Sequence, residues 1–339
     1  MTITNLAELL SESQSDYVIY DLGRRVQAID AATFQAICNQ QRPYPYPLQD
    51  HAWFAVVFWP QLSEAQPEPF LWFLKIPVDE RGLLNHAAQQ EFMAHVIALL
   101  GQQITGALDQ QQEQQLQQSA YLFTPSEAKR AALHAQLTVR FNKAPSHYYA
   151  AAVAELTNPT PQGWQQLGLQ GIHDAAARLA EQSQQTQAVA QHFASYAENL
   201  QKALAEALEH TTPPSALLQP LLHCLTEQTS TTRLNALRAL AGFAKQPDVQ
   251  ADLQALLPNS SMDELVIITA RLWPALQGEL MQPYLVRIAE LNNPALFAGV
   301  VRDILRLPDT RIHALGLVQR NDLPAVLYKA WQQFMGRHQ

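Results

Sequence analysis

Helix-breaking residues recur regularly in the second half of the chain, and this feature restricts the fold most. From Pro213 to Pro324, prolines and turn-forming clusters return about every ten to twenty residues. The chain is rich in strong helix formers, with 49 alanines, 48 leucines and 41 glutamines among its 339 residues. We therefore expect short helices packed in pairs from about residue 213. Their layout resembles HEAT or armadillo arrays, but no repeat of fixed period is present, so an irregular helical bundle stays open.

The stretch from Gly171 to Pro213 has no internal glycine or proline. It keeps one apolar stripe at helical spacing, which predicts one long helix, or two helices split near 182–187. The stripe consists of Val189, Phe193, Tyr196, Leu200 and Leu204.

Capping residues mark several helix starts. Ser261 and Glu264 form a capping-box pattern, and Asn293 places a capping side chain before Pro294. The segment 124–127, Thr-Pro-Ser-Glu, predicts another start, with Thr124 as the cap and proline in the first turn.

The first hundred residues follow a different pattern. Residues 17–21 and 25–30 are β-prone runs around Gly23, which we expect to supply the positive φ of a tight hairpin. Residues 53–59 and 70–76 are apolar on both alternating faces, which predicts central strands covered on each side. The aromatic residues of these two strands are expected to form core.

Helical segments surround these strands. We expect helices from Asn5 to Glu12, from Ala31 to about Gln41 with Asp30 as its cap, and over the segment that contains Phe92 and ends near Gln103. The fold class is therefore α+β: an N-terminal domain with an antiparallel sheet and the order α-β-β-α-β-β-α, followed by an all-helical domain. The domain boundaries are 1–103, a Gln-rich helical connector over 104–124, and 125–339.

Charge is sparse and uneven. Lysine and arginine number 22 against 30 acidic residues, so the whole chain carries a net charge of −8. Residues 1–270 carry −11 and residues 271–339 carry +3. Arginine forks bind carboxylates or phosphates, so the basic end is a possible surface for an acidic partner. For so small an excess, ordinary surface arginines, some of them with internal partners, are the favoured explanation. The arginines concerned are Arg271, Arg287, Arg302, Arg306, Arg311 and Arg320.

Candidates for catalysis and metal binding are weak. His86 and His95 lie nine positions apart, on opposite sides of a helix, and Glu91 with His95 gives too few ligands for a zinc site. Asp79 and Glu80 are expected to be solvated turn charges. His223 and Cys224 adjoin in an apolar helix and are expected to be core or near-core residues. We predict no catalytic residues, no metal and no cofactor.

Two tyrosines, Tyr44 and Tyr46, alternate with prolines over 43–47 and are candidates for an exposed interaction surface. The two cysteines lack paired spacing, and the longest apolar run, 53–59, is too short to span a membrane. The first fifteen residues contain no lysine or arginine, unlike a classical signal peptide. We therefore expect a soluble, cytoplasmic protein.

Segments 15–17, 20–26 and 71–84 resemble an uncharacterised family of gammaproteobacterial proteins of similar length. These segments read Ser-Asp-Tyr, Tyr-Asp-Leu-Gly-Arg-Arg-Val and Leu-Trp-Phe-Leu-Lys-Ile-Pro-Val-Asp-Glu-Arg-Gly-Leu-Leu. The family is a domain of unknown function that covers essentially the whole chain. The resemblance implies a bacterial cytoplasmic protein and carries over no activity or site.

The missing catalytic patterns and the paired helices favour a non-enzymatic interaction or scaffold protein whose helical array binds another protein. The alternatives are an enzyme of unrecognised type using segment 79–95, and a polyanion or nucleic-acid binder using the arginine-rich end. Nucleic acid is disfavoured because the whole chain is acidic. We expect no membrane partner, and a homo-oligomer stays open.

Overall fold

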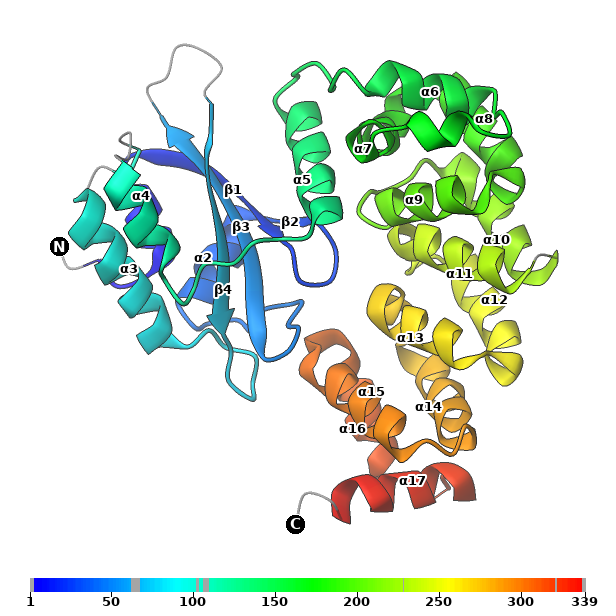
Figure 1. Ribbon diagram of the computed structural model, residues 1–339. Helices are drawn as coiled ribbons and strands as arrows, with labels where there is room; N and C mark the ends of the chain where they lie inside the picture. Colours follow the sequence, from blue (N-terminus) through cyan, green and yellow to red (C-terminus); the bar gives the residue numbers. More distant parts are fainter. Residues whose placement is uncertain are drawn as a thin grey trace. The chain divides into compact units, whose positions relative to one another are not determined.

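The chain folds into two compact units, seen in the computed structural model (Figure 1). The structure describes residues 3–61, 68–101, 104–105, 110–227, 229–320 and 322–336. The first unit comprises Met1–Ser126 with Arg306–Pro308, and the second comprises Glu127–Leu305 with Asp309–Gln339. Each unit is built on its own hydrophobic core.

The first unit has the predicted α+β architecture and element order. Its elements are α1 (Leu6–Glu12), β1 (Ser15–Asp21), β2 (Gln27–Ile29), α2 (Ala31–Cys38), β3 (His51–Pro60), β4 (Phe70–Pro77), α3 (His86–Leu100) and α4 (Gln110–Gln117). The predicted cap of α2 is confirmed, since the Asp30 carboxylate accepts a hydrogen bond from the Thr33 N–H.

The four strands form one antiparallel sheet in the order β2-β1-β3-β4. The apolar runs on β3 and β4 therefore have different positions: β3 is central, as predicted, whereas β4 is an edge strand and its predicted central position is wrong. Residues on both faces of β3 are buried, with Val56 and Val57 fully covered. On β4 the side chain of Leu71 is 40% exposed.

One face of the sheet packs against helices. Helices α1 and α2 contact β1, and α3 contacts β4. Phe54, Phe58 and Trp72 point into this core, where the Trp72 ring meets the Phe92 ring edge to face at 5.7 Å. These aromatic residues form core, as expected from the sequence.

The turn between β1 and β2 does not use the predicted positive φ at Gly23, because that residue is not among those with positive φ. Instead, the buried Asp21 carboxylate accepts hydrogen bonds from the backbone N–H groups of Gly23, Arg24 and Arg25. Glycine fits the limited space here, because a Cβ would lie 3.1 Å from the Trp53 ring, closer than an ordinary van der Waals contact. The prediction named the right residue for the wrong reason.

The Gln-rich segment folds as part of the first unit instead of forming a separate connector. Helix α4 packs against α3, and Leu122 forms a bridge to Leu74 of β4. Helix α3 ends at Leu100; Gln103, the end expected from the sequence, and residues 106–109 of the Gln-rich segment lie outside the described residues.

The second unit is helical. Its α-helices are α5 (Glu127–Arg140), α6 (Tyr149–Thr157), α7 (Leu169–Arg178), α8 (Ser183–His192), α9 (Glu198–Leu208), α10 (Leu218–Glu227), α11 (Ser230–Ala239), α12 (Pro247–Leu256), α13 (Met262–Arg271), α14 (Met281–Glu290), α15 (Pro294–Arg306), α16 (Pro308–Val318) and α17 (Ala325–Gly336). Odd-numbered helices α5 to α13 pack side by side in one row, and α6, α8, α10 and α12 pack in a second row (Figure 1).

Buried polar side chains link neighbouring helices of the first row. The Asn235 amide of α11 donates to Gln201 Oε1 of α9 at 2.8 Å. From the same helix α11, Arg233 Nε donates to the buried Glu264 carboxylate of α13 at 2.8 Å. These bonds satisfy groups that would otherwise be costly to bury, and they fix how each helix is aligned with the next.

The stretch from Gly171 to Pro213 forms three α-helices, α7, α8 and α9, and not one or two. The first break lies at Gln182, as the two-helix alternative expected, and a second falls at Tyr196 and Ala197. At each break a side chain takes a carbonyl that leaves the helix: Thr186 donates to the Leu179 oxygen and Gln201 donates to the Phe193 oxygen. The predicted stripe is buried throughout.

The predicted caps can be compared directly. The capping box of Ser261 and Glu264 is confirmed at α13, and Asn293 Oδ1 accepts from the Leu296 N–H at the start of α15. Helix α5 begins at Glu127, later than the start predicted at Pro125.

Candidate functional site

The outer edge of β4 is the feature of the first unit that most resembles a binding site. In its pairing with β3, the backbone N–H and C=O groups of residues 70, 72, 74 and 76 point toward β3. The backbone N–H and C=O groups of Leu71, Phe73 and Lys75 therefore point outward. Such outward groups are available for pairing with another strand.

The second half of this edge is already paired. The Lys75 N–H donates to the Tyr121 oxygen at 2.7 Å, and the Phe123 N–H donates to the Phe73 oxygen at 3.1 Å. The pairing ends there because Pro125, which would stand opposite Leu71, has no N–H. Within the described part of the chain, no group bonds to the outward N–H or C=O of Leu71.

A groove of about 480 Å³ lies where the 121–124 segment separates from β4. This volume falls in the range of ligand-binding pockets, roughly 300–1,000 Å³. It is lined by Phe70, Leu71, Trp72, Phe73, Leu116, Gln117, Leu122, Phe123 and Thr124. None of these residues is charged, so the groove suits an uncharged, largely apolar occupant.

The two sides of the groove differ in composition. On the sheet face away from the helices, the Phe123 ring meets the rings of Phe73 and Trp53 edge to face. On the helix side, Trp72 and Leu116 are almost fully buried in the core. Both walls are apolar, and on the helix side only the margins of Trp72 and Leu116 reach the groove.

Charges lie only toward the ends of this edge. Glu68 is exposed just before β4, and the Lys75 ammonium lies over the Trp53 ring, 4.7 Å from its centroid. The middle of the edge, from Phe70 to Phe73, has no charged side chain.

Among the six predicted surface arginines, Arg271 and Arg320 pair with carboxylates. Arg271 Nε lies 2.8 Å from the Glu209 carboxylate, and Arg320 pairs with Asp322 at 2.7 Å. Salt bridges of this kind hold the guanidinium in place within the protein and leave less of it to bind a partner.

The other four arginines lie on α14, α15 and α16. Arg287 donates to the Ser260 oxygen at 3.1 Å, and Arg311 donates to the Leu305 oxygen at 2.5 Å. Arg302 is exposed, and Arg306 is the last, partly buried residue of α15. An arginine surface for an acidic partner stays a prediction.

The predicted exposed pair of tyrosines is wrong for Tyr44. Tyr44 has no exposed surface, and its hydroxyl donates to Asp21 Oδ1 at 2.5 Å. Burial, together with the adjacent Asp21 charge, raises the pKa of Tyr44 well above its ordinary value. Tyr46 is partly buried and packs edge to face on Tyr44.

The weak catalytic candidates have structural partners. Glu91 accepts from the Tyr121 hydroxyl at 2.6 Å, and His95 Nε2 lies 3.2 Å from the Gln115 oxygen, so both fasten α3 to the segment that follows. His86 contacts Gln90 on its own helix. No group of three potential metal ligands occurs among the described residues.

The turn and thiol candidates are also accounted for. Asp79 accepts from the N–H groups of Arg81 and Leu83, which fixes the turn. Burial alone would raise the pKa of Asp79, but these hydrogen bonds and the Arg81 guanidinium together lower it below its ordinary value. Glu80 is exposed in that turn. His223 is exposed, whereas Cys224 is buried and donates to the Pro220 oxygen, and burial raises the pKa of its thiol.

One charged cluster in the second unit was not predicted by any sequence pattern. Glu209, at the end of α9, has its Oε2 within 3.1 Å of Arg238 and 2.8 Å of Arg271. The neighbouring His210 ring stacks 6.3 Å from His173, whose Nε2 has no partner among the described residues. Burial lowers the pKa of His173 to about 4, so the ring is neutral at pH 7.

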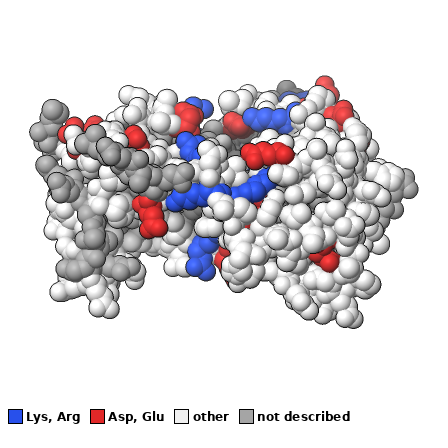
Figure 2. All heavy atoms as spheres, turned by 90° about the horizontal axis from the view of Figure 1, so that it is seen from above, with Lys and Arg blue, Asp and Glu red and all other residues white. Residues whose placement is uncertain are grey.

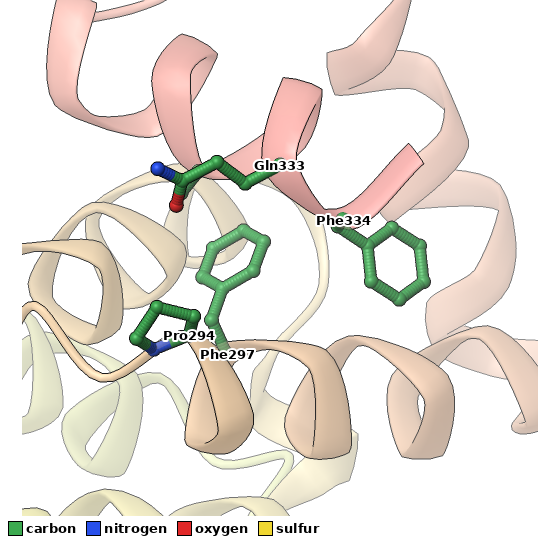
Figure 3. Close-up of a pocket in the computed structure, with 5 residues that line it drawn as sticks. Pro294, Phe297, Gln333 and Phe334 are labelled. Atoms are coloured by element: carbon green, nitrogen blue, oxygen red, sulfur yellow. The ribbon is translucent and has the colours of Figure 1, made fainter. Parts of the chain in front are cut away.

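A second gap, between α15 and α17, is too small to be a site. Figure 3 shows Phe297 and Phe334 beside it, with Pro294 and Gln333 at its margin. Its volume is about 10 Å³, which is at the limit for one water molecule. It is a packing defect between helices.

The surface is poor in charge. Figure 2 shows that most atoms on the drawn face belong to residues other than lysine, arginine, aspartate and glutamate, in keeping with a charged content of 15%. Among the described helices, none has the length and apolar character needed to cross a bilayer.

Comparison with known proteins identifies a family. A family model described as "Protein of unknown function (DUF3549)" matches residues 1–335. The match confirms the resemblance to an uncharacterised family that covers nearly the whole chain. No curated protein matches the chain. No solved structure matches it either.

Proposed function

Since the chain belongs to this family of proteins of unknown function, we propose from its own geometry that it is a non-enzymatic interaction protein. In this proposal, a segment of another protein binds in the groove beside β4. The observation that carries it is an uncharged, mainly apolar groove of about 480 Å³ at a sheet edge.

The lining residues support binding over catalysis. Besides the indole N–H of Trp72, their polar side-chain groups are the Gln117 amide and the Thr124 hydroxyl. Neither has a general base among the other lining residues, as an activated nucleophile would require. Apolar walls and a few uncharged polar groups are what recognition of an apolar segment needs.

The second unit fits the same function as a scaffold. In this proposal, its two rows of packed helices serve as a HEAT-like array, in which stacked helix pairs present an extended surface. Both cysteines are buried free thiols, consistent with a reducing compartment, and we include a cytoplasmic location in the proposal.

The proposal is tested with a displayed library of random seven-residue peptides, selected on the immobilised full chain. Leu71→Arg places a charge in the groove, and Met262→Arg is the matched control because Met262 is an exposed apolar residue on α13. We expect peptides to be enriched on the wild type and on Met262→Arg, and to be lost on Leu71→Arg. No enrichment on the wild type, or equal enrichment on Leu71→Arg, would overturn the proposal.

A further inference from the structure

Given the proposed function, on which this inference rests, we propose that the occupant is an extended segment of another protein that adds to β4 as a short strand at Leu71. Its side chains on both sides are uncharged and mainly apolar. The reasons lie in the backbone of β4, in the chemistry of the groove walls and in the position of Phe123.

The backbone of Leu71 provides one donor and one acceptor on the open edge. The backbone N–H and C=O groups of Phe70 and Trp72 point toward β3. Those of Leu71, which lies between them, therefore both point away from β3. An antiparallel strand with one residue opposite Leu71 would therefore form two hydrogen bonds there, one in each direction. A helix in the same groove would leave both groups unpaired.

The walls determine which side chains fit. Side chains of paired residues lie on the same face of a sheet, so the occupant residue opposite Leu71 lies on the face of Phe73 and Phe123. The residues on either side of it point to the helix side, toward Trp72 and Leu116. A charged side chain on either face would lose water without gaining a partner.

A second copy of this chain fits this edge poorly. If two β4 strands paired about Leu71, Phe73 of one copy would stand opposite Pro69 of the other. The position opposite Phe73 is already occupied by Phe123, whose N–H donates to the Phe73 oxygen at 3.1 Å. The free edge therefore admits a narrow segment that ends or turns beside Phe123.

The test uses the most enriched seven-residue peptide from the displayed library, synthesised with blocked ends. Leu71→Pro removes the outward N–H and no bond to β3, while Leu71→Ala keeps that N–H and shortens the side chain. We expect Leu71→Pro to weaken binding roughly tenfold or more, and Leu71→Ala to weaken it less. Circular dichroism of each variant checks that the sheet is intact.

A second measurement does not depend on how Leu71→Pro folds. Each peptide amide is methylated in turn, and binding to the wild-type chain is measured. We expect a loss of roughly tenfold at the residue opposite Leu71 and little loss at its two neighbours, whose N–H groups point away from β4.

The outcomes separate the two proposals. If the peptide binds the wild type but not Leu71→Arg, yet tolerates Leu71→Pro and methylation at every position, the groove binds and strand addition is wrong. Enriched peptides with apolar residues at helical spacing would also overturn strand addition. A wild-type dimer that Leu71→Pro converts to monomer would overturn the choice of occupant. If no peptide binds the wild type, the proposed function itself fails.

Discussion

Replacing Tyr44 with phenylalanine removes a buried hydroxyl that lies 2.5 Å from Asp21 Oδ1 and 3.2 Å from the Trp53 oxygen. The change removes the hydroxyl that donates to Asp21 and keeps the ring, which packs edge to face on Phe54 at 5.0 Å. Asp21 is fully buried, so water cannot replace the lost donor without rearrangement.

The expected cost follows from the remaining partners of Asp21. A hydrogen bond to a charged group contributes about 1.5–3 kcal/mol to stability. The Asp21 carboxylate keeps the backbone N–H groups of Gly23, Arg24 and Arg25, so it is not left bare. We therefore expect a loss of about 2 kcal/mol, which corresponds to a roughly 30-fold change in the unfolding equilibrium.

Hydrogen exchange measured by mass spectrometry reads this change in the full chain, where two units make a single unfolding curve hard to interpret. The slowest amides of β1 and β3 should exchange roughly 30-fold faster in Tyr44→Phe. Tyr328→Phe is the matched control, because Tyr328 is exposed on α17, and it should leave these rates unchanged. A change of less than about twofold in Tyr44→Phe would refute the reasoning.

Two further predictions concern the buried cluster of the second unit. Glu209→Ala leaves Arg238 and Arg271 without their shared carboxylate. We expect the free energy of unfolding to fall by about 2 kcal/mol, less than for a fully buried pair because both arginines are partly exposed. An unchanged melting temperature would contradict this expectation. His173 has a pKa of about 4 in the folded chain, below its ordinary value of 6.5. Between these two pH values the unfolded chain binds more protons than the folded chain, so the stability of the folded chain falls as the pH drops through that window. By pH 5 the loss relative to pH 7 should be about 2 kcal/mol. His173→Phe should remove this part of the pH dependence, and equal pH slopes for variant and wild type in thermal unfolding would show that His173 does not cause it.

Local signals in the sequence predicted local structure well. Asp30, Ser261 and Asn293 cap the helices they were expected to cap, because a cap depends on residues within one turn. The order of helices and strands along the first unit followed from alternation and turn residues in the same way. Breaks at Gln182 and Tyr196 were harder to place, because side chains from the next helix, and not a proline or glycine, take the released carbonyls.

The candidate site depends on contacts distant in sequence, which a single chain does not reveal. Tyr44 looked exposed between prolines, but its hydroxyl reaches Asp21, 23 positions earlier. Leu71 lies in a strand as apolar as its neighbour β3, and its place at the edge follows from where the 121–123 segment pairs. Pro69 was the available signal, since proline just before a strand is typical of an edge.

The polar bonds between neighbouring helices also limit how this protein can change in length. Gln201 of α9 pairs with an amide on α11, whereas Glu264 of α13 pairs with a guanidinium on that same helix. Deleting one helix pair would bring α9 beside α13 and set an amide against a carboxylate that has lost its arginine. Identical repeats can be added or removed without such a mismatch. In this array each helix is matched to its own neighbours, so insertions and deletions are expected in the turns and not as whole helix pairs.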